Sequence, residues 1–272
     1  MDTEDWDRAP LVQAITAGQL HVSLEAAALI LAQQEYPDLD PAPWLAQIDA
    51  LAAAGRGSLS AQPDAPEIVG VTSDILFRDG KFHGNTGDYY DPRNSFLNDV
   101  IARRTGIPIT LSILYMAVAR RLGLELHGTA FPGHFLVVHP RPGWPVVLDA
   151  FGHGRILSEG ECRRLAEQQG FPWDRRTLDP LPATLVLRRV LNNLKAIYAG
   201  RQDWARLLRT SAQILAVTPE DSSEYFTQGV AWAGLGRRET AIAAFEHYLT
   251  VRPDASNRDD VLDLLSQLRL KR

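Results

Sequence analysis

Residues 84–151 read GNTGDYYDPRNSFLNDVIARRTGIPITLSILYMAVARRLGLELHGTAFPGHFLVVHPRPGWPVVLDAF, and this stretch decides the fold. Its hydrophobic pattern predicts a helix, a turn, a second helix and then two strands. Residues 140–145 form the loop that closes the two strands into an antiparallel hairpin. The rest of the chain is organised around this unit.

Counting outward from that loop sets the register of the hairpin. It places His134 opposite Phe151, and it places Asp149 opposite Leu136. His134 and Asp149 then share one face, because side chains alternate with period two, and they are diagonal neighbours about 7 Å apart at the backbone. An Asp that orients a His is two thirds of a nucleophilic apparatus, in which the third part is a thiol or hydroxyl.

The order of these residues resembles the core of the transglutaminase-like superfamily. In that family a Cys begins a helix, the catalytic His follows on a strand, and the Asp follows on the next strand. The resemblance assigns the catalytic His to His134 and the Asp to Asp149, whereas the family's Cys would fall on Pro108, at the start of IPITLSILYMAVARRLG. Since proline cannot act as a nucleophile, the resemblance implies that the ordinary chemistry is absent.

Two motifs indicate a particular subgroup of this superfamily. The bacterial Sir-B-type subgroup, whose members carry a tetratricopeptide-repeat tail, has motifs that two segments of this chain resemble. These segments are YYDPRNSFLNDVIARRTGIPITLSILY and FPGHFLVV. The resemblance covers most of the chain and implies an α+β fold of the papain/transglutaminase-like kind, with helices packed on a small antiparallel sheet.

Composition limits the class of protein. The 272 residues are 45% hydrophobic, which suffices for a sizeable core, and the net charge of −5 with scattered basic doublets provides no footprint for nucleic acid or anionic lipid. One cysteine cannot form an internal disulfide, the first ten residues are acidic, and no apolar run approaches the roughly 20 residues that span a bilayer. We therefore expect a cytoplasmic protein without nucleic-acid or membrane partners.

Capping residues and glycines predict the other helices. They are expected over Ala9–Ala17, Leu24–Gln34, Pro41–Gly55 and Glu67–Phe77, in one helix opened by Asp91 and Pro92, and from a capping box at Ser158 to Gly170. The predicted domains are a helical region over 1–66, the transglutaminase-like core over 67–180 and a helical domain over 181–272.

An internal repeat appears in the last of these domains when the chain is compared with itself at a shift of 34 residues. The matched pairs are Tyr198 with Trp232, Leu208 with Ile242, Leu215 with Leu249, Val217 with Val251 and Pro219 with Pro253. Thirty-four is the period of tetratricopeptide repeats. Two repeats are fewer than the roughly three needed for independent stability, so we expect them to dock on the core, closed by a helix over 261–270.

Cys162 is the one candidate to replace the lost nucleophile, and two hydroxyls lie near that nucleophile's position. Cys162 lies in the first turns of a helix, where the backbone dipole favours thiolate. The family order, however, places the nucleophile before the His, and lone cysteines are usually buried. Thr110 and Ser112 follow Pro108, but hydroxyls inside helices more often bond a preceding carbonyl.

A polar segment could line a pocket beside the His and Asp. Its candidate residues are Asn85, Tyr89, Asp91, Arg93 and Asn94, joined by Ser112. The same residue types also suit turns and a helix cap. The backbone amides of residues 106–109 are the candidate oxyanion site.

Two functions follow. The first is a non-catalytic protein-interaction or scaffold module that binds another protein or peptide through its repeats. The second is a hydrolase or acyl-transfer enzyme in which His134 acts as a general base oriented by Asp149. A structural alternative also stands, in which Asp149 only holds His134 in a hydrogen bond within the hairpin.

The sequence contains little that indicates a metal site or a cofactor-binding site. His127, His134, His139 and His153 lie in one region, but no two have the spacing of a structural zinc motif. Neither a GxxxxGK[ST] loop nor a GxGxxG fingerprint is present. We therefore expect no metal and no cofactor.

Overall fold

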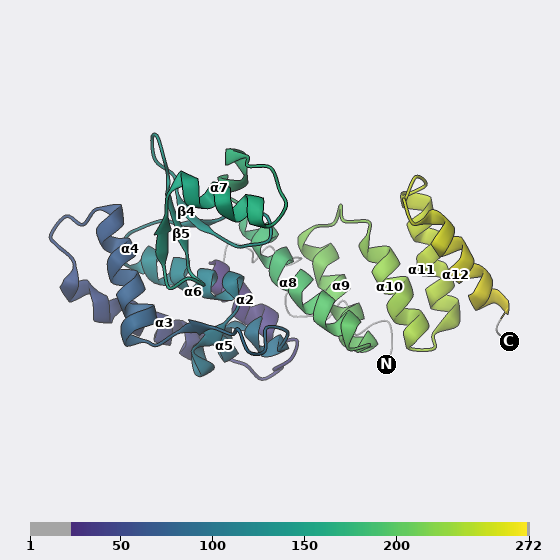
Figure 1. The fold of residues 1–272 in the computed structure, drawn as a ribbon. Coiled ribbons are helices and arrows are strands. Elements are labelled where there is room, and N and C mark those ends of the chain that lie inside the picture. Colours follow the sequence, from purple (N-terminus) through teal and green to yellow (C-terminus); the bar gives the residue numbers. More distant parts are fainter. Residues whose placement is uncertain (1–22, 271–272) are drawn as a thin grey trace. The chain divides into compact units, whose positions relative to one another are not determined.

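The computed structural model describes residues 23–270, so the expected helix over Ala9–Ala17 lies outside the described residues. The described chain forms two compact units, and the boundary between them falls after Leu187 (Figure 1). The first unit combines helices with a small antiparallel sheet, which confirms the α+β prediction.

The first unit contains six α-helices among the described residues. They are α2 (Leu24–Ala32), α3 (Pro41–Gly55), α4 (Ala65–Ser73), α5 (Leu97–Arg103), α6 (Pro108–Arg121) and α7 (Glu159–Gln168). Shorter helical turns are η2 (Arg56–Ser58), η3 (Asp74–Asp79, π-helical), η4 (Pro92–Asn94) and η5 (Arg175–Leu178).

Capping explains where several of these helices begin. Asp40 accepts a hydrogen bond from Ala42 N at the start of α3, which spans the predicted residues. Ser158 and Glu161 form the predicted capping box of α7. Two predicted bounds were wrong: α2 ends at residue 32, and the helix expected over 67–77 begins at residue 65 and turns π-helical at residue 74.

The single helix expected after Pro92 was also wrong, because the chain divides there into η4 and α5. Phe96 lies between them in an extended conformation and is fully buried, with its ring edge-on to Tyr36 at 5.9 Å between centroids. Burying this ring requires the extended backbone, so the helix must start again at residue 97.

Four antiparallel strands form the sheet, in the order β3 (His127–Gly128), β4 (Val137–His139), β5 (Val146–Asp149) and β6 (Arg155–Leu157). Val137 pairs with Leu148 in the observed register. This is the predicted register, and the predicted loop over 140–145 joins the two strands.

One part of the hairpin prediction was wrong. His134 lies in the turn before β4 and not on the strand itself, since β4 begins only at Val137. Strands β3 and β6 were not predicted, and neither was a short parallel pair of β1 (His83–Gly84) with β2 (Thr105–Gly106).

Helix α6 is the centre of the first unit. Every residue from 109 to 119 is buried, because α2, α3, α4 and α5 surround this helix. Helix α7 covers one face of the sheet, where Val138, Val147 and Leu157 from three neighbouring strands contact its buried side chains. The sheet therefore lies between a long apolar helix and a short amphipathic one.

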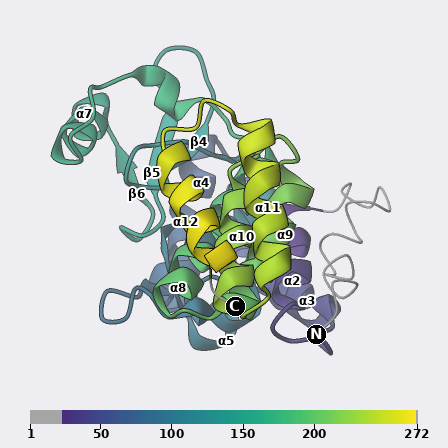
Figure 2. The same cartoon turned by 90° about the vertical axis from the view of Figure 1, so that its right-hand side faces the viewer.

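The second unit is helical. It contains most of α8 (Ala183–Gly200), then α9 (Trp204–Val217), α10 (Glu224–Gly234), α11 (Arg238–Val251) and α12 (Arg258–Leu270) (Figure 2). The ends of α8 and α10 and both bounds of α9 and α11 repeat at a shift of 34 residues, as the sequence comparison predicted. A Cβ at Gly234 would lie 2.5 Å from the ring of Trp204, so this repeated glycine lets the helices approach closely.

Candidate functional site

His134 and Asp149 meet in the structure. His134 Nε2 lies 3.1 Å from Asp149 Oδ1, and the two side chains keep 22% and 12% of their surface exposed. The imidazole therefore contacts both solvent and an orienting carboxylate. Nε2 itself is buried, so a general base would have to act through the other ring nitrogen, and the same contact would also serve a purely structural role.

A tight turn after β5 positions Asp149. Gly152 N donates to Asp149 Oδ1 at 3.0 Å, and Gly154 N donates to Asp149 O at 2.9 Å. A Cβ at Gly152 would lie 2.8 Å from Asp149 Oδ2, so the approach requires a glycine. Gly154 has φ +74°, a second position that favours glycine.

The charge of Asp149 follows from these contacts. Burial raises the pKa of Asp149, but its hydrogen bond and electrostatic interaction with His134 and the backbone amides of Gly152 and Phe151 lower it by more, so the net pKa is below the ordinary value. Asp149 is therefore an anion near neutral pH and is able to orient an imidazole.

No side chain in the described residues around the start of α6 supplies an evident nucleophile. Pro108 occupies the first helical position. Ser112 Oγ donates to Pro108 O at 2.7 Å, as expected for a hydroxyl within a helix. Thr110 Oγ1 donates to Asn94 O at 2.7 Å and accepts from Ile107 N.

The cysteine is a core residue. Cys162 is fully buried among apolar side chains of the sheet and α7. Burial, followed by the charges of Glu161 and Glu159, raises the pKa of its thiol to about 11. The helix dipole, which lowers the pKa of a thiol, does not outweigh burial and these negative charges. The thiol therefore stays protonated.

The polar segment before η4 is held together by its own hydrogen bonds. Asn85 Nδ2 donates to Asn94 Oδ1 at 3.1 Å, and Asn94 Nδ2 donates to Asp88 O at 2.8 Å and to Tyr89 O at 3.2 Å. These bonds are the turn chemistry that the residue types suggested. Tyr89 is partly exposed, with its ring edge-on to Tyr90.

Asp91 is the charged centre of the same segment. Its carboxylate is buried and lies 2.9 Å from Arg93 Nη2 and 3.2 Å from Arg103 Nη2. Burial raises the pKa of Asp91, but its hydrogen bonds to Arg93 and the charge of Arg103 bring the net value below the ordinary one. Asp91 also accepts from Arg93 N and so caps η4.

An aromatic contact links the residue before the polar segment to the turn after Asp149. Phe151 lies two residues after Asp149, and a Cβ at Gly84 would lie 2.3 Å from the Phe151 ring. The residues before the segment therefore pack on the turn that holds Asp149. A ligand pocket between them stays a prediction.

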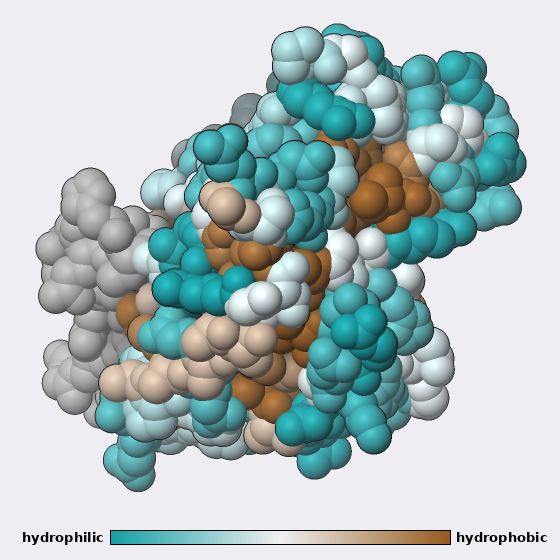
Figure 3. Space-filling model, turned by 90° about the vertical axis from the view of Figure 1, so that its left-hand side faces the viewer, coloured by the Kyte–Doolittle hydropathy of each residue, from teal (hydrophilic) through white to brown (hydrophobic). Residues whose placement is uncertain are grey.

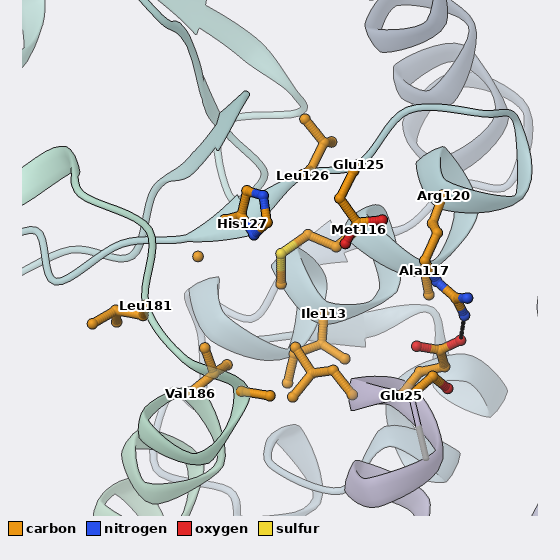
Figure 4. A pocket seen from close by; sticks show the side chains of 14 residues that line it. Glu25, Ile113, Met116, Ala117, Arg120, Glu125, Leu126, His127, Leu181 and Val186 are labelled. Atoms are coloured by element: carbon orange, nitrogen blue, oxygen red, sulfur yellow. Dashed lines mark hydrogen bonds and ion pairs between the residues drawn. The ribbon is translucent and has the colours of Figure 1, made fainter. Parts of the chain in front are cut away.

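A separate cavity of about 240 Å³ lies beside α6. Ile113 and Met116 line it from α6, His127 lines it from β3, and Glu25 pairs with Arg120 at its edge (Figure 4). The sequence did not predict this cavity, because its walls come from three distant segments. Within residues 23–270, no group of three or more His, Cys, Asp or Glu side chains has the arrangement of a metal site.

None of the helices within residues 23–270 is both long enough and apolar enough to cross a bilayer.

Two protein-family models match the chain, one over most of the first unit and the other over most of the second. The model of the transglutaminase-like superfamily matches residues 42–192, and a tetratricopeptide-repeat model matches residues 194–266. No solved structure gives a significant match.

Three relatives show how far the likeness extends. A UPF0162 protein of Xylella fastidiosa (strain Temecula1) is 36% identical over 255 residues, which cover 92% of this chain and 91% of that protein. Human F-box only protein 21 is 32% identical over 181 residues, 62% of this chain and 28% of that protein. The UPF0162 protein YchA of Escherichia coli K12 is 27% identical over 188 residues, 66% of this chain and 68% of that protein. The chain therefore belongs to the transglutaminase-like superfamily and to the UPF0162 family, with tetratricopeptide repeats after its core.

Proposed function

We propose that this protein is an interaction module that binds another protein through its repeats, joined to a transglutaminase-like core that lacks the family's chemistry. Proline at the family's nucleophile position and a thiol buried in the core both support a non-catalytic core. Membership of the Sir-B-type subgroup and a cytoplasmic location are part of the same proposal.

The observation that carries the proposal is a hollow of about 270 Å³ in the second unit. Ala196 and Ala199 of α8 line it together with Leu207 of α9 and Thr227 and Val230 of α10. The α8 wall combines these alanines with Asn192 and Lys195, and Phe226 adds apolar surface to the opposite wall. Such a surface suits a partner side chain, and stacked repeat helices commonly present one to a peptide.

Replacing an exposed alanine of this hollow tests the proposal. We expect Ala196→Arg in the intact chain to reduce the amount of a specific captured partner at least tenfold, because the long side chain fills the hollow. Ala243→Arg is the matched control, since residue 243 is also an exposed helical alanine of the second unit but does not line the hollow. Quantitative mass spectrometry of proteins captured from lysate measures both variants. Equal loss in the two variants would contradict the assignment.

A hydrolase or acyl-transfer enzyme is the second candidate. The 3.1 Å approach of His134 Nε2 to Asp149 Oδ1 and the partial exposure of the imidazole favour it. A base of this kind would act on water or on a substrate group, since no activated thiol is at hand.

Hydrolysis of a panel of acyl esters and amides by the intact chain separates the two candidates. The interaction proposal predicts equal, background rates for the wild type and for His134→Ala. A fall of about a hundredfold or more in His134→Ala would assign general-base chemistry to this residue. Cys162→Ser is the control, because a buried thiol should contribute nothing to the rate.

A further inference from the structure

Two hollows adjoin each other on the first unit, far from the His and Asp in the sequence. Their volumes are about 290 and 280 Å³, and both are lined by Leu51, Ala54, Gly80 and Arg104. Because they share these four lining residues, the hollows adjoin, and we call them together the α3 groove. Figure 3 faces the side on which Figure 1 places α3 and α4, and it shows apolar side chains gathered there.

Helix α3 forms one wall of the α3 groove. It contributes Gln47, Ala50, Leu51 and Ala54, which have the spacing of a single helix face. This face is about 10 Å long at 1.5 Å per residue. Since residues 50 and 54 are exposed alanines, a second helix is able to approach α3 closely here.

The opposite wall is rigid. It includes Ile75, Gly80, Phe82 and Ile101, all of which are buried. A Cβ at Gly80 would lie 2.6 Å from Ile75 O, so the glycine permits the sharp turn that ends η3. The groove is therefore preformed, and a ligand would lose little free energy in ordering it.

Two arginines line the α3 groove, and within the described residues only one of them is paired with carboxylates. Arg78 is already paired, with Asp74 at 2.9 Å and Asp79 at 3.1 Å. Arg104 lies in the wall common to both hollows and is exposed, and no carboxylate within residues 23–270 forms an ion pair with it. A ligand that enters the groove thus meets an unpaired cation between two hollows. One hollow is mostly apolar, and the other combines Leu51, Val71 and Ile75 with the paired charges around Arg78.

We propose that the α3 groove binds an amphipathic helical segment of a partner protein, with apolar residues three or four positions apart and an Asp or Glu between them. The apolar residues enter the two hollows, and the carboxylate pairs with the Arg104 guanidinium. This surface is distinct from the repeats. Its test leaves the second unit unchanged, so either proposal can fail without the other.

Selection from a displayed library of random 16-residue peptides on the intact chain tests the groove. We expect enriched peptides to show the acidic and apolar pattern and to bind with a Kd at least tenfold weaker to Ala54→Arg and to Arg104→Glu. Replacing the acidic residue of a selected peptide by Lys should restore part of its binding to Arg104→Glu. Fluorescence anisotropy of labelled selected peptides measures each affinity, and circular dichroism confirms that the variants fold.

Ala53→Arg is the matched control, because residue 53 is the preceding exposed alanine of α3 and lines neither hollow. We expect it to change the Kd less than twofold. The proposal is overturned if no peptide is enriched, if the enriched peptides lack the pattern, or if Ala53→Arg and Ala54→Arg weaken binding equally. It is also overturned if sedimentation shows a dimer that Ala54→Arg dissociates, since the occupant would then be a second copy of the chain.

Discussion

Replacing Tyr115 by Ala should lower the free energy of unfolding of the first unit by about 3–5 kcal/mol, the usual cost of removing a large buried aromatic side chain. Tyr115 is fully buried in α6, and its ring stacks on Phe77 with 6.1 Å between centroids. Its hydroxyl donates to Val69 O at 2.6 Å and lies 3.0 Å from Ser73 Oγ. The variant loses the packing of the ring on Phe77 and the hydrogen bond of the hydroxyl to Val69 O, which still accepts from Ser73 Oγ.

Tyr115→Phe separates the contribution of the buried ring from that of the hydroxyl group. This variant keeps the ring and loses only the hydroxyl, so we expect a cost of about 1–2 kcal/mol. Hydrogen exchange of amides in α4 and α6 at increasing urea concentration measures the first unit separately from the second. Equal losses in the Ala and Phe variants would show that the ring contributes no packing.

Glu25→Ala should cost about 1.5–3 kcal/mol in the same measurement, because it removes the charge-assisted hydrogen bonds that a buried carboxylate accepts from Arg120 and Arg121. Arg121 keeps its pairing with Asp49, and Arg120 is partly exposed. Glu25 is buried at the start of α2, and its Oε1 accepts from Arg121 Nη1 at 2.8 Å and from Arg120 Nη2. These contacts join α2 to the end of α6. Asp49→Ala is the matched control, because Asp49 also pairs with Arg121 but its side chain is 64% exposed. We expect that control to change stability by about 0.5 kcal/mol or less.

The cost of Glu25→Ala should depend on pH. Burial raises the pKa of Glu25, but the hydrogen bond from Arg121, a backbone bond and the charge of Arg120 bring the net value below the ordinary one. A carboxyl whose pKa is lower in the folded state contributes its full stability above its ordinary pKa. That contribution is lost as the pH falls through the folded pKa.

The difference in unfolding free energy between wild type and Glu25→Ala should therefore be constant above about pH 6 and shrink below about pH 4. Urea unfolding in buffers from pH 7 to pH 3, followed by exchange in α2 and α6, measures it. A difference that does not change with pH would rule out ionised Glu25 as the source of the stability.

Local patterns predicted several elements correctly because each depends on neighbours in the chain. The loop over 140–145 and period-two alternation set the pairing of Val137 with Leu148, which brings His134 near Asp149. A side-chain cap and a following proline predicted the start of α3. The 34-residue repeat predicted two copies of one helix pair in the second unit, and the observed helices repeat at that period.

Contacts between residues far apart in the sequence determined the features that local patterns did not predict. Burial of Phe96 against Tyr36 divided the helix expected after Pro92, and burial in the core set the protonation of Cys162 against its helix dipole. No local pattern contains either contact.

Periodicity, capping and motifs within one stretch were thus enough to predict the α+β class, the repeats and the hairpin register. Only the tertiary structure decided the state of the thiol, the bonding of the polar segment and the α3 groove. Each of these depends on side chains that approach from separate parts of the chain, such as Leu51 and Arg104, and their free energies come from burial, which local spacing does not encode.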